Sequence, residues 1–351
     1  MKRLRICAGA LLLTLFGGAA PATQQLPDVT IYLPRFEAEG TIGANVTATL
    51  NLAVWRTLRK KPWPNPVNRD FGSGLVIWSD DVLPGNAART AASTLRENRD
   101  LDMILWGSAR AVGPDVVVQA YLLTRQLEDE AAPPQALWRV SRDGRTLSLG
   151  APRQLYVMGA VPLRHDVVAL FSTPSALKLC PTKTRVCTGP EVGPTMRALE
   201  HDGPWTSLVT PDRRRGWVYL YDIGTQSNEI ASFSGAMISY YRGDYDQAAR
   251  LFATVGRTTS ANAVVQQDAA ALRAASLSRS GLPAAPAIDA VRQADPYAVY
   301  PLQVAIMDVL SSSYPSHRAR ALATELQSKI GLFDVDDPWP RRALALLEAA
   351  K

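Results

Sequence analysis

The sequence predicts an α+β multidomain protein made of a mixed α/β sheet domain, a small β-barrel and an all-α C-terminal domain. Three observations predict this architecture. Strand and helix patterns alternate over residues 28–123, short apolar segments separated by Gly, Pro and Asp fill residues 173–222, and an alanine-rich helical pattern begins near residue 230. The 25 prolines and 23 glycines are spread along the 351 residues and break the chain into short elements. The expected domains cover residues 27–172, 173–224 and 227–351.

The first region has the element order β-α-β-α-β-β. Val29, Ile31 and Leu33 share one face of a strand, because successive strand residues point to opposite faces. This order predicts a mixed sheet with helices packed against it. A hairpin over residues 137–149 follows, and residues 155–171 are apolar enough to complete the core as strand, helix or both. The expected strands cover residues 29–34, 75–78, 103–112 and 116–123, and the expected helices cover residues 46–58 and 87–98.

Residues 103–123 carry the most specific motif of this region. Ile104-Leu-Trp-Gly-Ser-Ala-Arg110 is followed by a glycine turn and then by Val116-Val-Val-Gln-Ala-Tyr-Leu-Leu123. This hairpin resembles the N-terminal domain of the TolB-like periplasmic proteins, and the resemblance implies their α/β fold. TolB itself carries a β-propeller after this domain. No propeller repeat follows here, so the resemblance does not extend to its partners.

The first 22 residues have the pattern of a secretory signal peptide. Three basic residues, Lys2, Arg3 and Arg5, precede an apolar run over residues 8–16, and Ala20-Pro-Ala22 provides an A-x-A cleavage site. The run is too short to span a bilayer, and no later segment has the roughly 18 uninterrupted apolar residues of a membrane helix. We therefore expect a periplasmic protein, cleaved near Ala22, without a transmembrane segment.

The charge of the chain argues against nucleic acid as a partner. Removing the three basic residues of the signal peptide lowers the formal net charge from +6 to +3. A nucleic-acid footprint needs a clustered basic face and a domain pI above about 9.

The end of the predicted barrel has two tryptophans across a charged turn. Trp205 closes Gly203-Pro-Trp205, and Trp217 lies in Gly216-Trp-Val218. This ending resembles bacterial SH3-like (SH3b) domains, which in exported proteins bind cell-wall peptides or proteins. Flat aromatic rings supply contact area at low entropy cost, and a neighbouring arginine attracts an acidic ligand. The alternative is that Trp217 and at least one partner form the barrel core. The candidate ligand-binding residues are Trp205, Arg215, Trp217 and Tyr219.

Two cysteines, Cys180 and Cys187, remain once the signal peptide is removed. In an exported protein, a pair this close predicts a disulfide that closes a short loop and adds roughly 2–2.5 kcal/mol. A zinc site would need two more Cys or His ligands, and a redox pair would need C-x-x-C spacing. We therefore expect a structural disulfide and no metal site.

The third region is helical. Gly243-Asp-Tyr-Asp-Gln-Ala-Ala-Arg-Leu-Phe252 resembles the start of the second helix of a tetratricopeptide (TPR) repeat, with Ala248 and Phe252 filling the seam between helices. A degraded copy follows, with a break at Gly281. TPR helices bind extended protein segments, so the resemblance implies protein binding. The later expected helices cover residues 269–280, 287–294, 316–329 and 341–350.

The sequence predicts no catalytic residue and no cofactor. The three histidines lie one in each region, and H-E-x-x-H, G-x-S-x-G and P-loop motifs are absent. We expect a non-catalytic periplasmic adaptor or scaffold that binds envelope proteins or peptides through its SH3b-like and TPR-like modules. The alternatives are a peptidoglycan-targeting regulatory subunit or hydrolase accessory protein, and a purely structural assembly factor. A bridged cysteine pair would leave a hydrolase without a thiol nucleophile.

Overall fold

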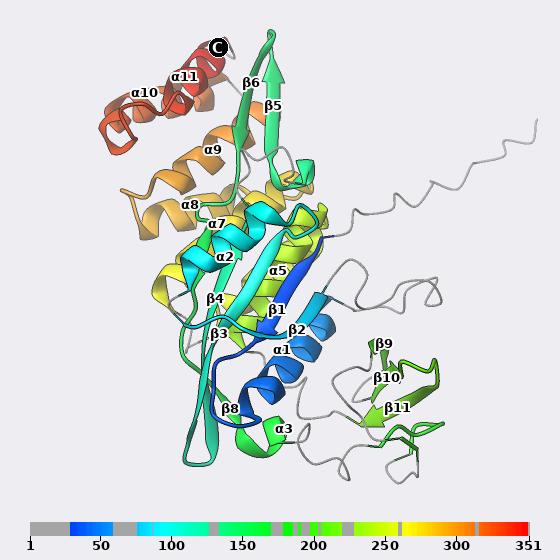
Figure 1. The fold of residues 1–351 in the computed structure, drawn as a ribbon. Coiled ribbons are helices and arrows are strands. Elements are labelled where there is room, and N and C mark those ends of the chain that lie inside the picture. The colour runs from blue at the N-terminus through cyan, green and yellow to red at the C-terminus, as the bar shows by residue number, and fades with distance from the viewer. Residues whose placement is uncertain are drawn as a thin grey trace, which may run out of the picture.

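A mixed six-stranded sheet forms the centre of the structure, which is a computed structural model (Figure 1). The strand order is β2-β1-β3-β4-β7, and β8 also pairs with β4. β1 is parallel to β2 and β3, whereas β4 is antiparallel to β3, β7 and β8. The strands are β1 (Ile31–Arg35), β2 (Val76–Val82), β3 (Met103–Val112), β4 (Asp115–Thr124), β7 (Leu155–Val157) and β8 (Val161–Arg164).

The structure describes eleven stretches of the chain. The signal-peptide prediction for residues 1–22 and the cysteine at position 187 lie outside them, as do parts of the predicted barrel. The described stretches are residues 29–58, 76–85, 87–125, 133–169, 178–184, 189–190, 197–202, 205–219, 228–258, 262–312 and 316–349.

The mixed sheet predicted from the sequence is confirmed. β3 and β4 pair without interruption from Met103 opposite Thr124 to Val112 opposite Asp115. Gly113 closes their turn at a φ of 58°, a conformation that glycine adopts without strain. The segment that could have been strand or helix is both, because β7 and β8 are followed by α3 (His165–Ala169).

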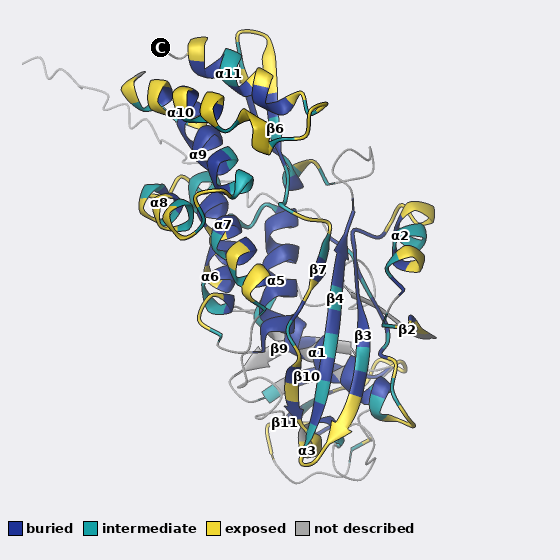
Figure 2. Cartoon of the chain, turned by 90° about the vertical axis from the view of Figure 1, so that its left-hand side faces the viewer, coloured by how far each residue is buried: buried dark blue, intermediate teal, exposed yellow. Residues whose placement is uncertain are grey.

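Helices cover both faces of the sheet. α1 (Ile42–Leu58) and α5 (Glu229–Arg242) pack side by side on one face, and α2 (Ala88–Glu97) packs on β3 and β4 from the other. Figure 2 shows α5 buried over its length between the sheet and the later helices. One hydrophobic core therefore runs from β1 and α1 through α5 into the C-terminal helices. A smaller core lies under α2, where Trp106 stacks on Tyr121 with ring centroids 5.4 Å apart.

The C-terminal region is all helix, as predicted. α5 and α6 form a helix pair joined at Gly243, whose φ of 81° ends α5, and Asp244 caps α6 by accepting from the Gln247 N–H at 3.1 Å. α9 was not predicted because it contains Pro301. That proline lies in the first helical turn, where no intrahelical N–H bond is lost. The helices are α6 (Tyr245–Val255), α7 (Ala263–Arg279), α8 (Ala285–Ala294), α9 (Val299–Ser311), α10 (Ser316–Ser328) and α11 (Trp339–Ala349), with short 3₁₀ turns at Pro134–Ala136 and Ile330–Leu332.

The predicted hairpin is β5 (Trp138–Arg142) and β6 (Arg145–Leu149). It packs on α9 and α11, and two tryptophans fix it there. The Trp138 Nε1–H donates to the Ser311 hydroxyl at 3.0 Å, and the Trp339 Nε1–H donates to the Ser148 carbonyl at 2.9 Å.

A second, antiparallel sheet contains β9 (Arg197–Asp202), β10 (Trp205–Val209) and β11 (Arg215–Tyr219), in the order β11-β10-β9. Cys180 forms an isolated bridge with Trp217, on the edge of β11 that does not pair with β10. The described strands form a meander. Closure into an SH3-like barrel, like the TPR assignment, stays a prediction. None of the described helices is long and apolar enough to span a membrane.

Asp102 joins the ends of two strands in the central sheet. Its Oδ2 atom accepts a hydrogen bond of 2.8 Å from the backbone N–H of Thr30, just before β1. The buried Arg125 guanidinium lies nearby and donates through Nε to the Leu101 carbonyl at 2.9 Å. Burial raises the pKa of Asp102 from 3.8 to about 6, although the Thr30 hydrogen bond and the Arg125 charge oppose the shift.

Replacing Asp102 by Asn should make the stability less dependent on pH. The raised pKa means that folding favours the protonated carboxyl, so its contribution is present below about pH 3.8 and is lost as the pH rises through about 6. This shift corresponds to a change in the free energy of unfolding of about 3 kcal/mol. Asn keeps an acceptor for the Thr30 N–H. The free energy of unfolding, measured with urea between about pH 4 and pH 7, should change less with pH for Asp102→Asn than for wild type. The exposed neighbour variant Asp100→Asn should behave as wild type. Equal slopes would contradict the prediction.

Candidate functional site

The register of the small sheet brings the four predicted ligand-binding positions together. Trp205 pairs with Tyr219, Ser207 with Trp217, and Val209 with Arg215. Directly opposed residues, and every second residue along a strand, share one face of an antiparallel sheet. Positions 205, 215, 217 and 219 therefore lie on one face, here called the aromatic face. The other face carries Leu208 and Val218, which are 2% and 1% exposed and belong to the core.

The segment 178–184, which bridges to β11 at Trp217, holds a basic group against the aromatic face. Cys180 is disulfide-bonded; the pairing with Cys187 stays a prediction. Cys180 donates its N–H to the Trp217 carbonyl at 2.8 Å and accepts from the Trp217 N–H at 2.6 Å. The Lys183 ammonium lies 4.3 Å from the centroid of the half-buried Trp217 ring, a cation–π contact. Trp217 is therefore neither fully in the core nor fully exposed.

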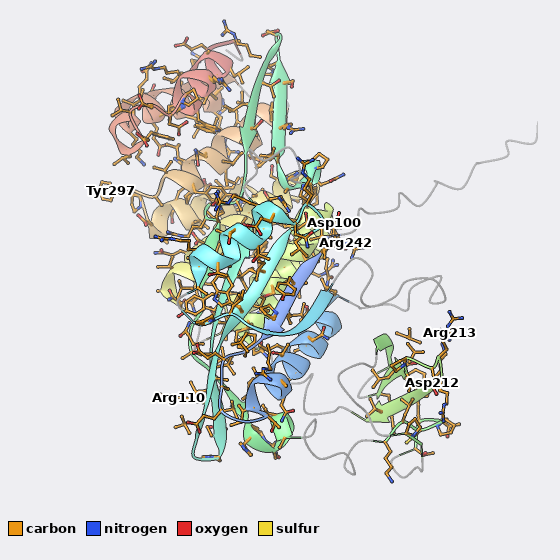
Figure 3. All side chains as sticks on the ribbon, in the orientation of Figure 1. Asp100, Arg110, Asp212, Arg213, Arg242 and Tyr297 are labelled. Carbon is orange, nitrogen blue, oxygen red and sulfur yellow. The ribbon has the colours of Figure 1, made fainter. Side chains whose placement is uncertain are left out.

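The turn between β10 and β11 presents arginines beside this face. Asp212 accepts hydrogen bonds from the Thr210 hydroxyl and from Arg214 Nε, and these bonds lower the pKa of its carboxyl. Arg213 lies at a φ of 66°, and it points away from the sheet in Figure 3. Within the described residues, the exposed side chains of Arg213 and Arg215 make no hydrogen bond or ion pair. The turn therefore offers two arginines to an anionic ligand.

A cavity lies in the helical region, between α7, α8, the start of α9 and the segment 148–153, which contains the end of β6 and most of its link to β7. Its volume is about 950 Å³, and we call it the helical groove. Its walls are made largely of small side chains, which leave room for a ligand to approach the helices closely. These residues are Ala263, Ala270, Ala271, Ala287, Ala290 and Ala294.

Polar groups occur at defined places in the helical groove. Arg153 and Asp268 form an ion pair of 2.7 Å between Nε and Oδ2, joining the linking segment to α7. Burial raises the pKa of Asp268, and Arg153 opposes that shift. The amide side chains of Gln267 and Gln303 also line the groove and make no hydrogen bond to any described residue. They can donate to and accept from a peptide backbone.

The helical groove was missed from the sequence. Ala287, Ala290 and Ala294 recur at helical spacing, but this pattern predicts only a helix and not a cavity beside it. The opposite wall comes from residues 148–153, more than a hundred positions earlier in the chain, and no local pattern indicates that contact.

The described residues contain no group of three or more His, Cys, Asp or Glu side chains placed to hold a metal ion. No protein-family model, curated protein or solved structure matches the chain at a significant level. The aromatic face and the helical groove both have the chemistry of binding sites.

Reduction of the disulfide should loosen the aromatic face. It releases the segment 178–184, which holds Lys183 on Trp217, and the short loop accounts for roughly 2 kcal/mol of stability. We expect dithiothreitol to lower the urea midpoint and to shift tryptophan emission to the red, with the emission change absent from Trp217→Phe.

A thiol titration of the denatured, unreduced mature chain should find no free thiol. Two free thiols would contradict the prediction and restore a possible nucleophile.

Proposed function

We propose that the protein is a non-catalytic adaptor of the cell envelope that binds segments of other polypeptides. The observation that carries the proposal is the helical groove, a cavity of about 950 Å³. It is lined by alanines and by two glutamine amides that make no hydrogen bond to any described residue. Ligand sites are typically concave and mostly apolar, with a few polar groups that fix orientation. The signal-peptide pattern of residues 1–22 supports export to the periplasm.

The packing of α5 and α6 supports a TPR-like unit as part of this adaptor. Ala248 and Phe252 are 0% and 1% exposed, and the Phe252 ring lies 5.8 Å from that of Phe233 on α5. Both residues thus fill the seam between the two helices. The meander and its aromatic face likewise support the SH3b-like module, which would give the adaptor a second binding surface.

Filling the helical groove should abolish peptide binding. We would pan the mature chain against a random decapeptide phage library, because the natural partner is not specified. Ala290→Trp places a large ring in the groove from an exposed position of α8, and Gln293→Trp adds the same ring to an exposed position of α8 that does not line the groove. We expect enriched peptides with wild type and Gln293→Trp, and none with Ala290→Trp. Recovery of the same peptides by all three proteins, or no enrichment with wild type, would overturn the proposal.

The aromatic face favours a second candidate function, the targeting of peptidoglycan for a hydrolase. Trp205 and Trp217 share that face, and aromatic rings are suited to stacking on sugars and peptides. Arg213 and Arg215 would add attraction for the acidic groups of the wall.

Sedimentation with purified, insoluble peptidoglycan tests this second candidate. Wild type should pellet with the wall, and Trp205→Ala should remain largely in the supernatant because the ring is lost from the face. Arg89→Ala removes an exposed arginine from α2, in the central sheet domain, and should behave as wild type. Equal pelleting of all three proteins, or no pelleting of wild type, would exclude the aromatic face as a wall-binding site.

A further inference from the structure

We infer that a cavity at the carboxyl end of β1, beside β3, binds a free basic amino acid. The cavity belongs to the central sheet, so this inference goes beyond the proposed function and does not depend on it. It is carried by the topology of the sheet, by a row of polar side chains on one of its faces, and by three charged side chains that form no ion pair within the described part of the chain.

The strand order places this cavity where open α/β sheets bind their ligands. β1 is parallel to β2 on one side and to β3 on the other, and the connecting helices α1 and α2 lie on opposite faces of the sheet. The strand order therefore reverses between β1 and β3. Ligands of such sheets bind outside the carboxyl ends of the strands at the point of reversal. A cavity of about 890 Å³ lies there, and we call it the strand-end cavity.

The chain that follows β1 and the second half of β3 supply most of the lining of the strand-end cavity. β1 ends at Arg35, whereas β3 continues to Val112 beside β4, so the β3–β4 hairpin extends beyond the end of β1 (Figure 1). The cavity therefore combines a loop with an extended part of the sheet that β1 does not cover. Its polar lining residues are Glu37, Glu39, Ser108, Arg110 and Gln119.

Three of these polar side chains form a row across one face of the sheet. Glu37 bridges Ser108 in the parallel sense, and Ser108 pairs with Gln119 on β4. Neighbouring residues of adjacent strands place their side chains on the same face. Trp106, two residues before Ser108, belongs to the core under α2, so the row lies on the α2 face.

Hydrogen bonds hold both ends of this row. Glu37 Oε2 accepts from the Gly85 N–H at 2.9 Å, and Gln119 Nε2 donates to the Met158 carbonyl at 2.6 Å. The other side-chain oxygen of Glu37 and of Gln119, like the Ser108 hydroxyl, makes no hydrogen bond to a described residue. The row therefore presents three oxygen atoms that can accept from an ammonium group.

Arg110 places a cation beside this row. It lies two residues after Ser108 and so shares the same face, and Figure 3 shows it on the β3–β4 hairpin. Its exposed side chain forms no hydrogen bond or ion pair with a described residue, Asp115 on the same face included. Strand spacings put its Cα roughly 8 Å from that of Glu37. A small ligand can therefore contact both groups at once.

Glu39 adds a second carboxylate to the strand-end cavity. It is exposed, and its side chain forms no hydrogen bond or ion pair with a described residue. The charged lining residues are thus two carboxylates and one guanidinium, which give the cavity a formal charge of −1. A free basic amino acid such as lysine has two ammonium groups and one carboxylate at neutral pH, and so carries the complementary charge.

This charge pattern determines how the ligand is held. The α-carboxylate pairs with Arg110, the α-ammonium with the row that begins at Glu37, and the side-chain ammonium with Glu39. A simple anion would face two carboxylates, and a diamine would leave the guanidinium of Arg110 without a partner. Opposite charges attract across such a site and like charges repel, so a zwitterion with one additional cation fits it best.

Isothermal titration calorimetry of the mature chain with lysine and three analogues tests the ligand class. Cadaverine lacks the carboxylate, norleucine lacks the side-chain ammonium, and Nα-acetyl-lysine lacks the α-ammonium charge. We expect lysine to bind most tightly and each analogue to bind roughly two- to fivefold more weakly, the range of an exposed ion pair. No binding of lysine, or equal binding of lysine and cadaverine, would overturn the inference.

Three variants assign each ligand charge to its residue. Arg110→Gln should remove the difference between lysine and cadaverine, and Glu39→Gln should remove the difference between lysine and norleucine. Glu37→Gln keeps an acceptor for the Gly85 N–H and should remove the difference between lysine and Nα-acetyl-lysine. Each comparison is a cycle in which one charge is deleted from the protein and its partner from the ligand, so lost differences identify direct pairs.

Matched controls separate this site from the rest of the molecule. Arg257→Gln and Glu348→Gln remove exposed charges outside the strand-end cavity and should keep all three differences. Ala290→Trp, in the helical groove, should bind lysine as wild type does, so the result is independent of the adaptor proposal. If the differences persist in the cavity variants, or disappear equally in the controls, lysine does not bind in the strand-end cavity and the inference fails.

Discussion

The burial of α5 is the constraint on which the rest of the structure depends. All fourteen of its residues are buried, so the helix needs partners on every side. Phe233 provides two of them, with its ring 4.8 Å from Tyr156 of β7 and 5.8 Å from Phe252 of α6. Gly235 allows a third, because a Cβ at this position would lie 2.1 Å from the Thr57 hydroxyl of α1. α5 therefore packs against both the central sheet and the helical array, at about 1.5–3 kcal/mol for each large apolar side chain removed from water.

This central position also places polar groups in the core. Glu229 is fully buried and accepts a hydrogen bond of 3.2 Å from the Gly159 N–H, and burial raises the pKa of its carboxyl. The hydroxyls of Tyr240 and Tyr241 are buried without a hydrogen-bond partner among the described residues. Such groups cost free energy when they are left unpaired. The packing of the helix against the sheet thus has to offset that cost with apolar contacts.

Sequence patterns identified most of the elements because strand alternation and helical periodicity are local properties. The β3–β4 hairpin and the break at Gly281, where φ is 74°, follow from residues within a few positions of one another. The contact of α5 with α1 does not, since it joins residues almost two hundred positions apart. The same distinction holds for the candidate sites. Alternation in β11 places Arg215 and Trp217 on one face from the sequence alone. The helical groove combines residues 148–153 with α7 to α9, and only the folded chain reveals it.

The linking segment gives the molecule a mechanical property. Residues 148–153 connect the hairpin anchored on α9 and α11 to β7 at the edge of the central sheet. Arg153 fastens the end of this stretch to α7 through Asp268. A force on the hairpin would pass through the covalent backbone into β7, and through the ion pair into α7. The segment would then share tension between the central sheet and the helices.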